Sequence, residues 1–216
     1  MEVLEKVSLR ERKVARVRLA LVRSLREKIN LMPFQQIRVE DLCEEALISK
    51  VTFFKYFPEK EALLVFASAC WMMEIQVEIR KNGLVGMQAI KMLFDLMSTV
   101  CTDSPNFMRA FHAMLSEKVK FPVGIELSNA DKVEMFPDVE PREYETRSMG
   151  NFIQRHIRLA LESGQIKTTL SEFEIACLVG TMFNGSGILG QRVYPDRPGD
   201  LYLLNYQILC KCLNYN

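Results

Sequence analysis

The sequence predicts an all-α protein in which a small N-terminal helical bundle precedes a larger helical body. Apolar residues recur at intervals of three and four in successive segments, which is typical of helices that bury one face. From residue 84 onward no segment alternates polar and apolar residues as a strand would, and proline and glycine separate stretches of helical length. The length of 216 residues suits one large or two small domains.

The first expected helix covers residues 9–31, and Pro33 ends it. Arginine and lysine crowd its other faces, which predicts a largely solvated surface with one or two arginines near any nucleic acid. Its apolar stripe consists of Val14, Val17, Leu21, Leu25 and Ile29.

Two short helices are expected next, at residues 38–46 and 50–57, with a break at Leu47 and Ile48. Ser49 suits the N-cap of the second one, because its hydroxyl can accept a hydrogen bond from an unpaired backbone N–H. Pro58 ends this helix, and Phe53 and Phe57, four residues apart, are expected to be buried together.

The remaining elements are also expected to be helices. The fourth begins near Glu59 and Glu61, whose charges suit a helix N-terminus, and closes at Asn82 and Gly83. Gly164 is expected to be a C-cap. The later helices are expected at residues 84–101, 106–118, 131–136, 141–163, 171–191 and 200–213.

Composition limits the possible functions. Six cysteines without a C-x-x-C pair, together with only two histidines, do not support a metal site, and no cofactor is expected. Motifs of common hydrolases and nucleotide-binding enzymes are missing from the sequence, so the protein is not expected to be an enzyme. No signal peptide precedes the first helix, and the apolar run at residues 177–190 is shorter than a membrane span, so a cytoplasmic protein without membrane insertion is expected.

Charge is distributed unevenly along the chain. Residues 1–60 contain 13 Lys and Arg against 9 Asp and Glu, whereas residues 61–216 contain 15 against 18. A basic N-terminal segment on a more acidic body fits a head that faces nucleic acid.

Two short helices joined by a tight turn, after a longer supporting helix, form the helix-turn-helix arrangement. The second short helix must project a polar, partly basic face into the major groove while its apolar face holds its angle. Residues 50–57 fit this requirement, because Val51, Thr52, Lys55 and Tyr56 are expected to lie outward and the two phenylalanines inward.

Residues 39–64, VEDLCEEALISKVTFFKYFPEKEALL, resemble the helix-turn-helix segment of the TetR family of bacterial transcription regulators. The resemblance extends over about residues 10–66, and a later Gly-Gln-Ile turn at residues 164–166 also fits the family. It implies a DNA-binding domain at residues 7–66, with the motif at about 38–57, and an effector-binding and dimerisation domain at residues 67–216.

The resemblance implies roles for single residues. Lys50, Val51 and Thr52 occupy the base-reading start of the recognition helix. The positions implied to meet the sugar-phosphate backbone are Arg38, Phe54, Lys55, Tyr56 and Lys60.

Three residues depart from the family pattern. Leu47 and Val51 replace usual glycines, and Phe54 replaces a usual tyrosine, so it lacks a hydroxyl for phosphate. The turn therefore lacks a glycine, the residue that adopts positive φ without strain. The methyl groups of Val51 offer a contact for thymine methyl groups.

The body carries two further expectations. Small and apolar residues on one face of the last two helices predict a two-fold homodimer, with the monomer core as the alternative; they are Ala176, Gly180, Phe183, Gly187, Leu201, Leu204 and Ile208. Methionine and aromatic residues can line an adaptable pocket for a small effector, or equally form ordinary core. The candidates are Phe94, Met97, Phe107, Phe111, Met114, Met149, Phe152 and His156.

The sequence therefore predicts a TetR-type regulator, a repressor that a small apolar or amphipathic effector releases from a double-stranded operator. Three alternatives stay open: a protein of this fold that acts through protein–protein contact without specific DNA binding, a helical enzyme, and a redox sensor that uses Cys210 or Cys212.

Overall fold

The computed structural model describes residues 7–117, 126–140, 144 and 149–215. Every regular element within these residues is helical, as the sequence predicted. The elements are α1 (Leu9–Leu31), the 3₁₀ turn η2 (Phe34–Gln36), α2 (Val39–Glu45), α3 (Lys50–Tyr56), α4 (Lys60–Lys81), α5 (Met87–Asp103), α6 (Pro105–Glu117), α7 (Asn129–Met135), α8 (Met149–Glu162), α9 (Glu172–Val193) and α10 (Asp200–Cys212).

Most helix ends lie within three residues of their expected positions. The larger differences are the short turn η2, which was not foreseen, and the expected helix at residues 141–163. Its described part is α8, over Met149–Glu162. Tyr144 is not helical, and residues 141–143 and 145–148 lie outside the described part of the chain.

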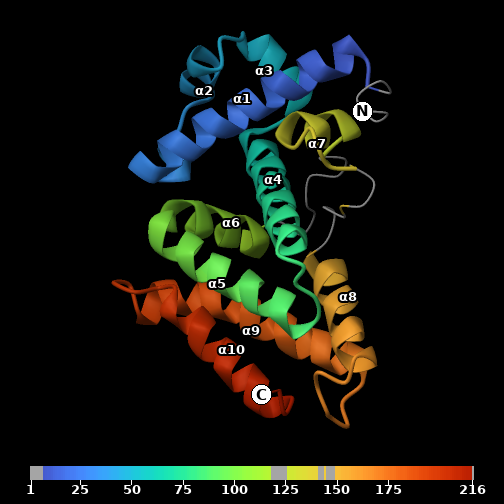
Figure 1. Ribbon diagram of the computed structural model, residues 1–216. Coiled ribbons are helices and arrows are strands. Elements are labelled where there is room, and N and C mark those ends of the chain that lie inside the picture. The colour runs from blue at the N-terminus through green and yellow to red at the C-terminus, as the bar shows by residue number, and fades with distance from the viewer. Residues whose placement is uncertain (1–6, 118–125, 141–143, 145–148, 216) are drawn as a thin grey trace. The chain divides into compact units, whose positions relative to one another are not determined.

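The chain divides into two compact units. Unit 1 consists of residues 1–74 and 113–147, and unit 2 of residues 75–112 and 148–216. In unit 1, α7 packs along α1, and the contacting residues Arg18 and Asp131 are 113 positions apart in the sequence (Figure 1). The expected division at residue 66 into DNA-binding and effector domains remains a prediction.

Unit 1 is built on a buried face of α1 whose members include Leu21, Leu25 and Ile29, all at most 1% exposed. The helix begins with a capping box, in which Ser8 and Glu11 satisfy each other's backbone N–H groups. Three residues of the predicted apolar stripe of α1 therefore form core as expected, whereas Val14 and Val17 are half-buried.

Unit 2 packs α5, α9 and α10 against one another, with α8 on α9 (Figure 1). Phe94 lies at the centre of its aromatic core, with ring centroids 5.5 Å from Phe183, 6.1 Å from Tyr202 and 5.7 Å from Tyr206. A side chain at Gly187 would come within 2.3 Å of His112, so this glycine permits close packing inside the unit.

Two helices, α4 and α9, are long and apolar enough to cross a membrane by length and composition alone, so the sequence-based estimate of the longest apolar segment was too short. This is weak evidence for a span, because core helices of soluble proteins pass the same test. Most of the apolar stretch of α4, 72%, is buried inside the protein, against 33% for α9.

Candidate nucleic-acid interface

Helix α3 is held in place by three phenylalanines behind it. Phe53, Phe57 and Phe66 are fully buried. The ring centroids of Phe53 and Phe57 are 5.8 Å apart, and those of Phe57 and Phe66 are 5.4 Å apart. Both distances lie in the range of favourable aromatic pairs. The predicted burial of Phe53 and Phe57 is confirmed, and it fixes which side of α3 faces outward.

The predicted N-cap of α3 is also confirmed. The hydroxyl of Ser49 accepts a hydrogen bond from the backbone N–H of Thr52 at 3.2 Å. This bond satisfies one of the N–H groups that the first turn of any helix leaves unpaired. The start of α3 is therefore fixed by local chemistry as well as by packing.

The turn between α2 and α3 keeps a left-handed residue even though no glycine is present. Leu47 has φ of 54° and is 90% exposed. A left-handed conformation costs a residue with a Cβ atom roughly 1–2 kcal/mol. The chain thus retains the turn geometry at some cost in stability.

The outward side of α3 is more apolar than a solvent-facing helix usually is. Val51 is 81% exposed and Phe54 is 48% exposed. Lys55 is exposed beside them, and Thr52 and Tyr56 are half-buried. Six of the eight residues expected to meet DNA lie on this helix, and the structure brings them to one short element.

The polar groups at the start of α3 are bound within the chain. Lys50 forms an ion pair with Glu40 of α2, and the hydrogen bond from Lys50 lowers the pKa of the Glu40 carboxyl. The hydroxyl of Thr52 lies 3.0 Å from that of Ser49. Any contact of Lys50 or Thr52 with a base edge must therefore compete with these partners.

Lys60, for which a phosphate contact was predicted, is bound to backbone carbonyls of its own chain. Its ammonium group donates hydrogen bonds to the backbone carbonyls of Phe34 and Ile37, both at 2.8 Å, and to that of Gln35 at 3.4 Å. It also lies 4.5 Å from the centroid of the Phe34 ring, and burial lowers its pKa. Lys60 therefore ties η2 to the start of α4, and a phosphate contact would have to compete with these carbonyls.

A concave pocket of about 440 Å³ opens between the N-terminal half of α1 and the end of α3. Cationic side chains from both helices line it together with a tyrosine and an apolar wall. The lining residues are Leu9, Arg10, Lys13, Val14, Val17, Lys55 and Tyr56. Among the residues that the structure describes, no carboxylate forms a salt bridge with its three cations.

Other cations of α1 are bound to α7. Arg18 pairs with the fully buried Asp131 at 2.9 Å and lies 4.0 Å over the ring of Phe66. Glu134 accepts a hydrogen bond from Arg16 at 2.6 Å and lies 3.7 Å from Arg12. These arginines hold α7 on α1, so only part of the basic surface predicted for α1 faces solvent.

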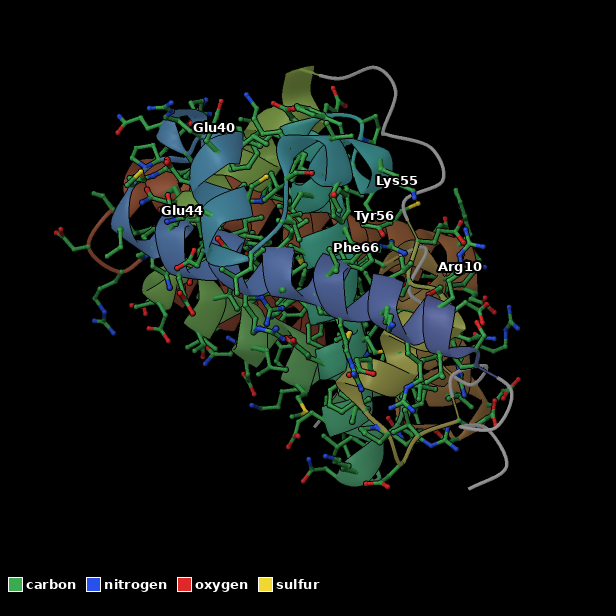
Figure 2. All side chains as sticks on the ribbon, turned by 90° about the horizontal axis from the view of Figure 1, so that it is seen from above. Arg10, Glu40, Glu44, Lys55, Tyr56 and Phe66 are labelled. Carbon is green, nitrogen blue, oxygen red and sulfur yellow. The ribbon has the colours of Figure 1, made fainter. Side chains whose placement is uncertain are left out.

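On the surface of unit 1 that carries α2 and α3, charges of both signs lie around Glu40, whereas the opposite end carries cations. Figure 2 shows Glu40 and Glu44 of α2 at one end, and Lys55, Tyr56 and Arg10 at the other. Arg38, the remaining expected phosphate contact, is exposed at the N-cap of α2. The pocket therefore lies at the cationic end of this surface.

The expected effector-pocket residues are mostly packed within the chain. Phe94 is fully buried in the aromatic core, and Phe152 and His156 lie with ring centroids 4.5 Å apart on α8. Burial lowers the pKa of His156 to about 4, so the ring is neutral near pH 7. Met97, Phe107 and Met114 are also buried, whereas Phe111 and Met149 are half-buried. Met114 falls in unit 1 and the other seven in unit 2.

The expected dimer residues separate into three groups by exposure. Phe183 and Gly187 are buried by their own chain, so the structure corrects their assignment to a dimer interface. Leu204 and Ile208 are 47% and 38% exposed. Ala176, Gly180 and Leu201 are half-buried, and a Cβ atom at Gly180 would meet nothing within 4 Å.

Solved structures with the same architecture include transcription regulators. Thermus thermophilus FadR, described as a TetR family transcriptional repressor in complex with lauroyl-CoA, has a TM-score of 0.62 at 17% identity, covering 91% of this chain and 94% of that one. The chain has the TetR-family fold. Bacillus subtilis FadR in complex with stearoyl-CoA gives 0.57 at 15% identity, with 91% and 97% covered. Salmonella enterica GusR gives 0.53 at 16%, with 92% and 95% covered.

No protein-family model matches the chain, and no curated protein matches it either. The predicted resemblance to the TetR family is thus confirmed in the fold, which extends over both units.

Leu9, Arg10 and Lys13 were not predicted as site residues. They lie within about one turn of α1, but nothing in their spacing shows that this turn lies beside the end of α3. The pairing of Glu40 with Lys50 was not predicted either. The distance of ten residues between Glu40 and Lys50 becomes a contact only once the α2–α3 turn is formed.

Proposed function

We propose that this protein is a ligand-responsive DNA-binding transcription regulator whose α3 enters the major groove. The observation that carries the proposal is the exposed side of α3, with Val51, Phe54 and Lys55, held outward by buried phenylalanines. A helix with one buried and one exposed side, next to cations, is what groove binding requires. The TetR-family fold supports the same function.

The pocket between α1 and α3 fits the sugar-phosphate backbone beside the groove. Arg10, Lys13 and Lys55 supply charge for a phosphate, and the leucine and valine wall suits the apolar face of a deoxyribose. Contacts of this kind position a protein on a duplex and release counterions, so they make binding salt-dependent.

A homodimer is proposed to present two copies of α3 to one operator. Support comes from large apolar side chains exposed on α9 and α10, since patches of this kind mark interfaces. They are Phe173, Ile188, Leu189, Leu203, Leu204 and Ile208. Sedimentation should give a dimer at micromolar concentration, and Leu204→Glu with Ile208→Glu should give a monomer. A wild-type monomer would contradict this part.

The effector is proposed to be a small apolar or amphipathic molecule that releases the protein, as a cytoplasmic repressor, from its operator. The FadR structures named above contain lauroyl-CoA and stearoyl-CoA, and unit 2 of this chain has an aromatic core. Lauroyl-CoA should raise the melting temperature and weaken DNA binding, because linkage requires such an effector to prefer the DNA-free state. No shift would exclude this acyl-CoA.

The proposal is tested by selecting duplexes from random DNA with the purified protein and measuring their affinity by gel shift. We expect an inverted-repeat site bound much more tightly than scrambled DNA, with affinity that falls as salt rises. Enrichment of no sequence, or equal affinity for scrambled DNA, would contradict the proposal.

A second candidate function is protein–protein contact without specific DNA binding. The exposed apolar Leu47, Val51 and Phe54 and the acidic Glu40 and Glu44 favour it, because groove-binding surfaces usually carry polar and cationic groups. The selection experiment separates the two candidates.

A further inference from the structure

The side chains that α3 offers to solvent are unusual for a helix that reads DNA. Val51 and Phe54 are three residues apart and share one face of α3, and they are 81% and 48% exposed. Leu47, in the turn just before this helix, is 90% exposed. We call these three residues the apolar ridge.

Two of the polar side chains next to the ridge, both at the start of α3, have partners inside the chain. Lys50 is paired with Glu40, and the hydroxyl of Thr52 lies within hydrogen-bonding distance of Ser49. Reading a guanine with Lys50 would require breaking an ion pair, and the freed Glu40 carboxylate would then face the duplex. Direct contact by the ridge is therefore the readout that needs no rearrangement.

In the major groove, the feature of a base pair that matches an apolar side chain is the 5-methyl group of thymine. The other edge groups are hydrogen-bond donors or acceptors, and a valine or phenylalanine against them would leave a desolvated polar atom without a partner. A ridge of this kind thus favours thymine over cytosine, guanine or adenine at the positions it touches.

We propose that the apolar ridge of α3 determines operator specificity by contact with thymine methyl groups. This inference rests on the proposed DNA-binding function and adds the class of site that α3 selects. DNA is favoured as the occupant over an apolar protein surface because Arg10, Lys13 and Lys55 line the pocket at the end of the same helix.

The test uses the full-length protein and the duplex that it enriches from random DNA. Each thymine of one half-site is replaced in turn by deoxyuridine, which removes the 5-methyl group and leaves base pairing intact. We expect one or two positions at which affinity falls about three- to fourfold, the effect of losing one buried carbon. The remaining thymines should show no change.

The variant Val51→Ser removes the methyl groups from the ridge at a site where exposure makes misfolding a small concern. At the position that Val51 touches, replacing thymine with deoxyuridine should no longer change the affinity of this variant. The matched control is Val85→Ser, which makes the same change at an exposed valine between α4 and α5 and should keep the full deoxyuridine penalty.

The possible results separate failure of the thymine-methyl contact from failure of DNA binding itself. Tight binding without a deoxyuridine penalty, or a penalty that Val51→Ser leaves unchanged at every position, overturns the inference and leaves the DNA-binding function standing. Selection of no duplex overturns both, and the apolar ridge would then indicate a protein partner.

Discussion

Unit 1 contains two sets of cations that look alike in the sequence and differ in the structure. Arg18 and Lys60 are bound by groups of their own chain, a buried carboxylate in one case and three backbone carbonyls in the other. Arg10, Lys13 and Lys55 line an open pocket. The first set holds the shape of the unit, and the second set is placed to bind an anion.

The difference shows that charge counts do not reveal which cations are accessible. The first 60 residues contain 13 Lys and Arg, yet several of them form ion pairs with carboxylates of α7 or donate hydrogen bonds to backbone carbonyls at η2. Substitutions in the first set are therefore expected to lower the free energy of unfolding. Substitutions in the second set are expected to change the salt dependence of DNA binding.

The largest effect is expected at Asp131. Replacing it with alanine leaves Arg18 partly buried without its carboxylate and also removes the capping group of α7. Loss of one partner of a buried pair costs about 3–5 kcal/mol. Urea unfolding should show a decrease of this order in the free energy of unfolding.

Glu134→Ala is the matched control for Asp131→Ala. Glu134 is on the same helix but pairs with more exposed arginines, so its loss should cost less than about 1 kcal/mol. Equal effects of the two variants would show that burial of Asp131 contributes nothing to the attachment of α7.

The next effect is expected at Lys60. Lys60→Ala leaves the carbonyls of η2 without their donor, and hydrogen bonds to a charged group contribute about 1.5–3 kcal/mol. The free energy of unfolding should fall by this amount, while the salt dependence of DNA binding should not change. A reduced salt dependence would instead support the phosphate contact of Lys60 that the sequence predicted.

Lys55→Ala is expected to behave in the opposite way. Loss of one phosphate contact should weaken binding to all duplexes several-fold and lower the slope of log affinity against log salt by about 1 per protomer. The melting temperature should stay the same because Lys55 is exposed. Lys167→Ala, an exposed lysine of unit 2, is the control and should change neither quantity.

The smallest effect is expected at Leu47. Leu47→Gly relieves the left-handed strain of about 1–2 kcal/mol, offset in part by the greater entropy of glycine in the unfolded chain. Calorimetry should show a net gain of about 0.5–1 kcal/mol. Leu47→Ala keeps the strain and should give no gain; a gain there would contradict the explanation.

Local features of the sequence were sufficient to predict most of the fold. The spacing of Leu21, Leu25 and Ile29, the N-cap at Ser49 and the pair of Phe53 and Phe57 each act within a few residues. The structure that these features adopt therefore depends little on the rest of the chain.

Features that depend on distant residues could not be predicted. Arg18 and Asp131 are 113 residues apart in the sequence, and the pocket joins α1 to the end of α3. Gly187 was expected to face a second copy, whereas the structure places it under His112 of its own unit. In each case the pairing depends on the three-dimensional path of the chain.

Binding of a duplex by α3 and the pocket beside it can be measured by fluorescence anisotropy of the selected duplex over a salt series. Wild type is compared with the triple variant Arg10→Ala, Lys13→Ala, Lys55→Ala. We predict a wild-type affinity that falls steeply with salt and a slope reduced by roughly 3 per protomer in the variant. Identical slopes for two equally folded proteins would contradict duplex binding by α3 and this pocket.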